Sequence, residues 1–214
     1  TNPIVFDNLC KFLAETFPED LATWLLGNPI TLTQLSPTEL FNEPIRADSL
    51  ILLQSPDRVL HIEFQTNPDE TMPFRMLDYW VRIRRRFPNK TIYQVVIYLR
   101  PSNSPLVYQG NFEGETTIHE FQVIRLWEQP KEIFFSAPGL LPFAVLSDSE
   151  NREEVLREVS QAVEMIEDKG VRSNLAAASE ILAGLVLKAE VVESFFRSEL
   201  MRESVIYQKI LEEG

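Results

Sequence analysis

Two short apolar runs on either side of a turn constrain this chain more than any other feature. Residues 50–53 read LILL and residues 59–64 read VLHIEF, and the turn-forming sequence Ser-Pro-Asp stands between them at positions 55–57. Short apolar runs that are bounded by turn residues are typical of paired strands. We therefore predict a β-hairpin over residues 46–65.

Alternation in the second run brings acidic residues to one place. Because successive side chains of a strand point to opposite faces, Glu63 is expected on the same face as His61 and Gln65. Asp48 stands at the mouth of the first strand, and pairing of the two strands would bring it near Glu63. A carboxylate in an apolar strand is costly unless it is paired or holds a metal, so we predict an acidic pocket at a sheet edge. The opposite face of the second strand is apolar: Leu60, Ile62 and Phe64.

Helical periodicity precedes and follows the hairpin. Apolar residues recur every three or four positions over residues 7–26, with a break at Pro18, which predicts two short helices with Asp7 as the N-cap of the first. Residues 30–45 are expected to be irregular. Residues 73–87 predict a longer helix. Its buried stripe is expected to consist of Phe74, Leu77, Val81 and either Ile83 or Trp80.

A buried strand is predicted after this helix, because residues 92–99 form the continuous apolar run IYQVVIYL. The order strand, strand, helix, strand makes a β-β-α-β unit. Within it Gln94 is expected to be either a neighbour of the site or a paired structural amide. Further strands are predicted at residues 106–108 and 117–126, around a turn at residues 110–114. His119 in the last strand is expected to be an ordinary strand or surface histidine.

The last third of the chain is helical by composition. A Pro- and Gly-rich patch at residues 138–142 indicates a boundary. Beyond it, a helix capped by Ser149 or Asn151 is expected, then helices over residues 171–187 and 191–211, with Lys169-Gly170 at a helix end. The expected division is residues 1–145 and residues 146–214. The second part is expected to pack on the first or on another copy of itself.

Charge and composition exclude several classes of protein. The net charge is −12, which argues against a general nucleic-acid binder, yet residues 70–100 carry 7 Lys or Arg and 2 Asp or Glu. One cysteine and two histidines do not suit a zinc site of the usual kind, and neither histidine has a Ser or Cys partner motif for a nucleophilic triad. The apolar runs are short of a membrane span and no signal segment is evident, so a cytoplasmic protein is expected.

The sequence RAD-x14-EFQ, which ends at Gln65, and the following MPFRMLDYWVRIRRRFP at residues 72–88 resemble the Rpn family of recombination-promoting nucleases, also called transposase-like. That family belongs to the PD-(D/E)xK nuclease superfamily. The resemblance implies an α/β fold with a restriction-endonuclease-like αβββαβ core, a mixed central sheet and a C-terminal helical appendage. One departure is that Gln65 stands where the superfamily motif has lysine, as in its ExQ variants.

The same resemblance implies the site. Asp48, Glu63 and the backbone carbonyl of Phe64 are expected to bind Mg²⁺ or Mn²⁺, while Gln65 orients the attacking water. The first helix of such a core often donates another acid, for which Asp7 and Glu15 are both candidates; a helix cap and a solvated acid are equally compatible with them. The DNA-contacting side chains are expected on the helix of residues 73–87, unless this is simply a solvated charged face: Arg75, Tyr79, Arg82, Arg85 and Arg86.

The leading functional hypothesis is a Mg²⁺-dependent deoxyribonuclease, an endonuclease that hydrolyses phosphodiester bonds in DNA recombination. Cutting two strands usually needs two active sites, so a homodimer formed through the C-terminal helices or the core is expected. A second hypothesis is a nuclease-fold module that binds DNA or a protein partner without cutting, because Gln65 supplies no positive charge. A third is a structural interaction protein that dimerises through residues 149–214.

Overall fold

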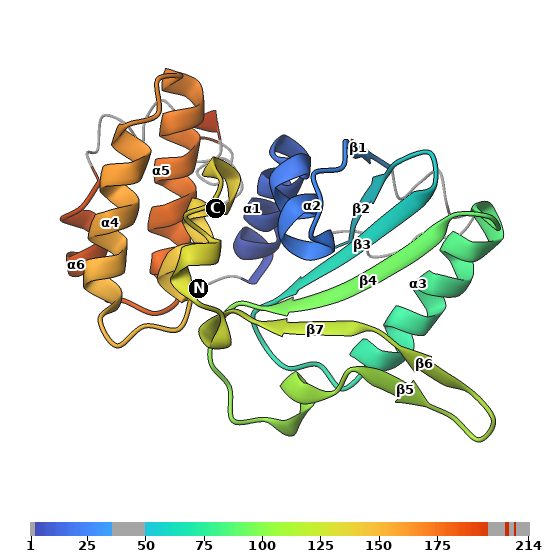
Figure 1. Cartoon of the computed structure of the whole chain (residues 1–214). Helices are drawn as coiled ribbons and strands as arrows, with labels where there is room; N and C mark the ends of the chain where they lie inside the picture. Colours follow the sequence, from blue (N-terminus) through green and yellow to red (C-terminus); the bar gives the residue numbers. More distant parts are fainter. Residues whose placement is uncertain (1–2, 36–49, 197–203, 206–207, 209–214) are drawn as a thin grey trace.

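A mixed five-stranded sheet lies at the centre of the chain, with helices on both of its faces (Figure 1). The computed structural model describes residues 3–35, 50–196, 204, 205 and 208. The strand order is β1-β2-β3-β4-β7, in which β1, β2 and β3 pair antiparallel and β3, β4 and β7 pair parallel. The strands of this sheet are β1 (Thr33–Gln34), β2 (Leu50–Gln54), β3 (Arg58–Gln65), β4 (Thr91–Tyr98) and β7 (Gln122–Arg125).

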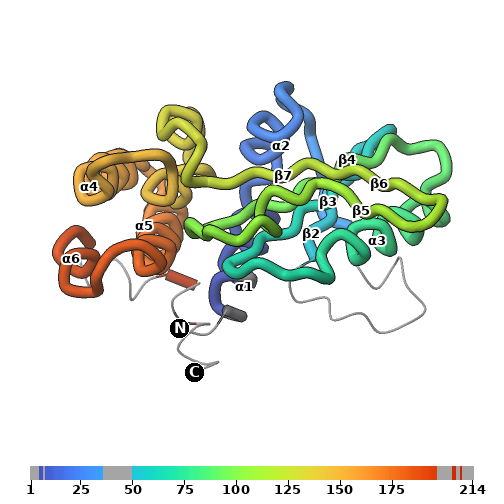
Figure 2. The backbone as a smooth tube through the Cα atoms, turned by 90° about the horizontal axis from the view of Figure 1, so that it is seen from below, coloured from blue at the N-terminus to red at the C-terminus, as the bar shows by residue number. Residues whose placement is uncertain are grey.

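The other elements surround this sheet, and the C-terminal helices lie at one end of it (Figures 1 and 2). A second, two-stranded sheet consists of β5 (Asn111–Glu113) and β6 (Ile118–Glu120). The α-helices are α1 (Pro3–Thr16), α2 (Pro18–Leu26), α3 (Met72–Arg86), α4 (Arg152–Glu164), α5 (Lys169–Ala183) and α6 (Ala189–Glu193). The 3₁₀ segments are η2 (Pro105–Tyr108), η3 (Leu126–Glu128), η4 (Lys131–Ile133) and η5 (Pro138–Leu146).

The predicted hairpin is confirmed over residues 50–65, and its first four residues, 46–49, lie outside the described part of the chain. β2 and β3 pair antiparallel, and Leu50 lies opposite Glu63. The predicted alternation along β3 is also confirmed, because Leu60 and Phe64 pack in the largest core cluster while Glu63 points to the other side. β1 provides a third antiparallel strand within residues 30–45, where only irregular structure was expected.

Helices α1 and α2 cover one face of the sheet (Figure 1). The predicted break at Pro18 is confirmed, and Gly27, at φ 75°, ends α2 in the left-handed conformation that glycine adopts without strain. We had predicted that Asp7 is the N-cap of the first helix, and this prediction is wrong. Helix α1 already begins at Pro3, since proline at a first helical position lacks only an N–H that has no partner within the helix.

Helix α3 covers the opposite face and completes the predicted β-β-α-β order (Figure 1). Of its predicted buried stripe, Ile83 is buried as expected, whereas Phe74, Leu77 and Val81 are not. Phe74 is 61% exposed and lies edge-on to Phe112 of β5, with ring centroids 5.5 Å apart. The stripe that packs on the sheet is offset around the helix and recurs at spacings of four, three and four: Met72, Met76, Tyr79 and Ile83.

The segment between β4 and β7 differs in part from the prediction. Residues 106–108 form the 3₁₀ segment η2 rather than a strand, because Ser104 caps it and Pro105 sets its first φ. The expected turn at residues 110–114 is also wrong, since β5 occupies residues 111–113 and the turn follows at Gly114. The strand prediction for residues 117–126 is confirmed as β6 and β7, and the β5–β6 hairpin lies beside α3 (Figure 2).

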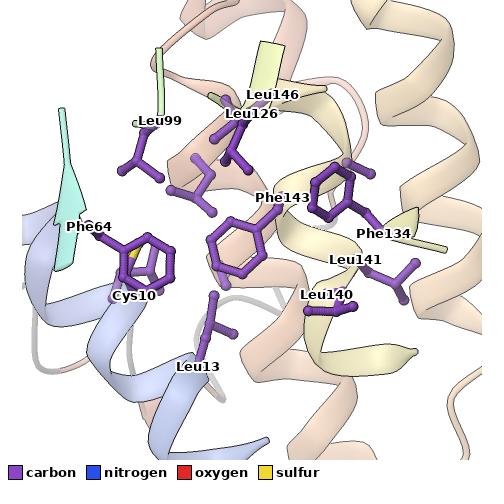
Figure 3. Packing of buried hydrophobic residues seen from close by; sticks show 14 of the residues in the cluster. Cys10, Leu13, Phe64, Leu99, Leu126, Phe134, Leu140, Leu141, Phe143 and Leu146 are labelled. Carbon is purple, nitrogen blue, oxygen red and sulfur yellow. The ribbon is translucent and has the colours of Figure 1, made fainter. Parts of the chain in front are cut away.

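Residues 138–142, where a boundary was predicted, are buried from Gly139 onward, whereas Pro138 is exposed. They begin η5, whose residues Gly139 to Leu146 are all buried. Phe143 stacks on Phe64 of β3 with ring centroids 5.5 Å apart and planes 1° apart (Figure 3). The apolar side chains of η5 therefore join the sheet to the C-terminal helices, and the same cluster includes residues of α1, α4 and α5.

The C-terminal helices follow the prediction with two corrections. Asn151 caps α4 as expected, because its side chain accepts a hydrogen bond from the Glu154 N–H. Lys169-Gly170 begins α5 and does not end a helix, since Asp168 accepts from the Val171 N–H as its N-cap. The helix predicted over residues 191–211 is wrong in the part that the structure describes, because α6 ends at Glu193 and residues 194–196 are not helical. Among the described residues, no helix is long and apolar enough to cross a membrane.

Candidate active site

A completely buried carboxylate lies between β3 and α3. The side chain of Glu63 has no exposed surface, although it stands near the end of β3. Arg75 of α3 places Nη2 3.6 Å from Glu63 Oε2, and His61 of β3 places Nε2 3.4 Å from Oε1. Burial of an ionised carboxylate is costly unless cationic or donor groups compensate it. Arg75 and His61 supply this compensation, one at each oxygen.

Arg75 also binds a second carboxylate. Its Nη1 lies 3.3 Å from Asp69 Oδ2, in the turn that leads into α3. Burial acts to raise the pKa of Asp69, but hydrogen bonds from the side chain and N–H of Thr71 and the charge of Arg75 outweigh it, so that this pKa is lowered. Arg75 Nε is buried and makes no hydrogen bond to the described part of the chain. The guanidinium thus faces both acids while one of its donors remains unused.

A chain of hydrogen bonds runs from Glu63 through His61 to the second sheet. Gln94 of β4 lies opposite His61 in the parallel pairing, and its Nε2 is 2.9 Å from His61 Nδ1 and 2.8 Å from the carbonyl oxygen of Met76. On the other side, Gln94 Oε1 is 2.7 Å from His119 Nε2. Residues of β3, β4, α3 and β6 are therefore tied together by one polar network in an otherwise apolar layer.

Two tyrosines border this network. The Tyr79 ring lies edge-on to the His61 ring at 5.2 Å. Burial, and then the negative charge of Glu63, raise the pKa of Tyr79 to about 12. Burial and the charge of Asp69 also raise the pKa of Tyr98. Both phenols therefore keep their protons at neutral pH and can act as hydrogen-bond donors.

The structure places the predicted ligands as follows. Asp48 lies outside the described residues. Gln65 is half-buried at the end of β3. The Phe64 side chain lies in the core on the other face of the sheet from Glu63. Glu15 belongs to α1, on the other face of the sheet from Glu63, where its Oε1 accepts a hydrogen bond from Gln34 at 2.6 Å.

The predicted DNA-contacting residues have different surroundings. Arg75 and Tyr79 face the buried network, and Tyr79 is almost completely buried. Arg82 pairs with Asp78 at 3.0 Å one turn earlier in α3. Arg85 is exposed, and Arg86 lies over the Phe87 ring at 5.8 Å. Arg84, which was not predicted, lies over the Trp80 ring at 5.2 Å and donates to two backbone carbonyls.

Sequence reasoning missed how closely His61 and His119 are connected to Glu63. The expectation that Gln94 is a paired structural amide is confirmed. His119 lies on a strand as expected, but it is part-buried and bonded to Gln94. The available signal was the alternation along β3, which already put His61 on the face of Glu63. His119 had no comparable signal, since its position depends on how the β5–β6 hairpin packs on α3.

Among the residues that the structure describes, no group of three or more His, Cys, Asp or Glu side chains is arranged to hold a metal ion. His61 and Glu63 are two such side chains in contact. Comparison with known proteins adds no assignment: no family model, no curated protein and no solved structure matches the chain.

Proposed function

We propose that the chain is a metal-dependent DNA endonuclease whose site is built around Glu63. The observation that carries the proposal is a carboxylate held with no exposed surface, 3.6 Å from a guanidinium that reaches it from the neighbouring helix. Stability alone gives weak grounds for such a group, because well-packed apolar residues are often as stable as a buried ion pair. Buried ionisable groups with specific charged partners are more frequent at functional sites.

The order of elements supports this proposal. Apart from the inserted helix α2, the order α1, β1, β2, β3, α3 and β4 matches the αβββαβ core of the nucleases that the sequence resembles. Asp48 precedes Leu50 by two residues, and Leu50 is the residue opposite Glu63. Leu50 and Leu52 pack on the α3 side of the sheet. In our proposal Asp48 continues this alternation and provides the second carboxylate.

The donor set suits a hard divalent cation. Carboxylate and carbonyl oxygens are the ligands that Mg²⁺ prefers, and Asp48, Glu63 and the Phe64 carbonyl would provide them. A bound Mg²⁺ would polarise a water and neutralise charge on the scissile phosphate. Gln65, half-buried at the end of β3, would orient that water through its amide. Arg75 would hold Glu63 in place and attract the phosphate.

The DNA backbone would lie along the later turns of α3. This part of the helix carries a dense positive charge, and its last turn is Arg84, Arg85 and Arg86. Phosphate contacts of this kind give affinity without sequence preference and weaken with salt. The net charge of the whole chain is −12, which would limit binding to this one basic surface.

Nicking of supercoiled plasmid tests the proposal. Wild-type protein should nick DNA with Mg²⁺ or Mn²⁺ and not with EDTA, and Asp48→Ala and Glu63→Gln should each lower the rate by about 10²-fold or more. Asp57→Asn is the matched control, because Asp57 lies in the same hairpin but pairs with Arg58 at its exposed turn. Gln65→Lys should preserve or raise the rate. Undiminished cleavage by both acid variants, with circular dichroism unchanged, would remove these residues from the mechanism.

A second candidate function is a nuclease-fold module that binds DNA or a protein partner without cutting. The observation that favours it is that both oxygens of Glu63 already face protein groups, with no exposed surface left for a ligand. Salt-dependent DNA binding without any metal-dependent nicking, and unaffected by Glu63→Gln, would support this alternative over the first.

A further inference from the structure

We infer that His61 is a positioning residue for Glu63, and that Gln94 holds it in a single tautomer with the proton on Nε2. The tautomer follows from hydrogen bonding alone. The effect of His61 on metal binding rests on the proposed function. The sequence indicated neither His61 nor His119 as a residue of the site.

The carbonyl oxygen of Met76 can only accept a hydrogen bond. It lies 2.8 Å from Gln94 Nε2, so the NH₂ end of the amide must face it. Turning the amide over would place Gln94 Oε1 against this carbonyl, oxygen to oxygen. It would also take the acceptor away from His119 Nε2, which lies 2.7 Å from Oε1. The amide therefore has one favourable orientation.

This orientation decides the state of the His61 ring. The second hydrogen of Gln94 Nε2 points to His61 Nδ1 at 2.9 Å, so Nδ1 must accept. The proton of the neutral ring is then on Nε2, which faces Glu63 Oε1 at 3.4 Å. The chain from Met76 through Gln94 thus directs one N–H of His61 to the carboxylate.

Packing prevents the ring from adopting another arrangement. His61 has no exposed surface, and the Tyr79 ring lies edge-on to it from α3. Leu52 of β2 and Gln94 of β4 lie opposite it in the sheet. A half-turn of the ring would exchange Nδ1 for a carbon and break the bond to Gln94. The ring is consequently fixed both in position and in tautomer.

Fixing His61 also fixes the Glu63 carboxylate. His61 donates to Oε1 and Arg75 lies at Oε2, so the plane of the carboxylate is set by groups on both sides. Partners that orient a metal-binding side chain in this way usually change metal affinity by about 10–100-fold when they are removed. A histidine that merely fills space in the core would have no such effect on metal binding.

The tautomer is tested on the wild-type protein by long-range ¹H–¹⁵N correlation of uniformly ¹⁵N-labelled material at pH 7. We expect the Nδ1 of His61 to show the shift of an unprotonated ring nitrogen and Nε2 that of a protonated one. Glu63→Gln identifies the His61 signals, because it should shift them more than those of His119. A protonated Nδ1, or averaged shifts from both tautomers, would overturn the inference.

The positioning role is tested by two variants that each keep half of the ring's hydrogen bonding. An amide in His61→Gln reaches the place of Nε2, whereas the shorter amide in His61→Asn reaches only the place of Nδ1. In calorimetric titrations with Mg²⁺ alone, His61→Gln should bind within about 3-fold of wild type, and His61→Asn about 10–100-fold more weakly. Urea unfolding of both variants measures any general loss of stability.

The two measurements separate the inference from the function on which it rests. Equal Mg²⁺ affinities in the two variants would overturn the positioning role. If the wild-type protein itself bound no Mg²⁺, the proposed function and the role in metal binding would both fail. The correlation spectrum would still decide whether Gln94 sets the tautomer of His61.

Discussion

Removing the guanidinium next to Glu63 should destabilise the fold more than removing any exposed arginine of α3. In Arg75→Met the side chain keeps most of its apolar length but loses its charge. Glu63 would then remain completely buried beside His61, but without the guanidinium. The folded state would then bury this carboxyl group without the guanidinium, whereas the unfolded chain exposes the group to water.

The expected loss follows from the geometry. Breaking a buried ion pair by removing one partner typically costs about 3–5 kcal/mol. The contact here is 3.6 Å long and the Arg75 side chain is 30% exposed, so part of the charge interaction is already screened by solvent. We therefore expect a loss of about 2–3 kcal/mol in the free energy of unfolding. Glu63→Gln should cost less, since Arg75 keeps Asp69 at 3.3 Å.

The assay is urea unfolding, followed by circular dichroism, of wild type, both single variants and the double variant. In this double-mutant cycle, residues in direct contact should show an interaction of about 1–3 kcal/mol. Arg82→Met provides the matched control, because Arg82 lies on the same helix and pairs with Asp78 at the surface. Its loss should be about 0.3–0.5 kcal/mol. Two results would contradict this prediction. One is a loss of unfolding free energy in Arg75→Met that is no larger than in the control. The other is a double variant whose loss equals the sum of the two single losses.

Three further predictions concern stability. Burial raises the pKa of Tyr79 to about 12, so the unfolded chain loses this proton first, and the stability that Tyr79 contributes declines from about pH 10 to pH 12. Tyr79→Phe should flatten that decline in urea unfolding, and an unchanged slope would contradict it. Burial, and then His61, lower the pKa of His119, so stability should decline as the pH falls below about 6.5, where the unfolded chain takes up the proton. His119→Asn should reduce the decline of stability at acid pH, and an equally steep decline in this variant would contradict the prediction. A Cβ at Gly139 would lie 2.3 Å from Phe17 Cβ, so Gly139→Ala should lower the free energy of unfolding by about 1–3 kcal/mol. An unchanged melting temperature would contradict this prediction, because it would show that η5 can shift to accommodate the methyl group.

Local patterns predicted the elements that position Glu63. Alternation along β3, the apolar run of β4 and the helix between them follow from residues near one another in sequence, and the structure has all three. The prediction of which side of α3 is buried was wrong for an identifiable reason. The helix has apolar residues on more than one side, and Phe74 fitted one stripe as well as Met76 fitted another. The side that packs on the sheet is the one whose Arg75 and Tyr79 also reach Glu63 and His61.

Contacts between distant segments were beyond the reach of such patterns. Gln94 joins His61 and His119 only because β3 and β4 pair in one register and the β5–β6 hairpin packs next to α3. The segment η5 was misread because proline and glycine usually indicate exposed turns. Here Gly139 lets the chain pass Phe17 closely, and the Asp20 carboxylate accepts a hydrogen bond from the Gly139 N–H at 2.8 Å.

The central claim is that Glu63 helps to hold a divalent cation. Crystals soaked in Mn²⁺ test it most directly, because the anomalous scattering of manganese locates the ion independently of the protein atoms. We expect an anomalous peak about 2.0–2.5 Å from a Glu63 carboxylate oxygen, with Asp48 as a second ligand. A well-ordered Glu63 that still pairs with Arg75 and His61, with no anomalous peak beside it at saturating Mn²⁺, would contradict the account.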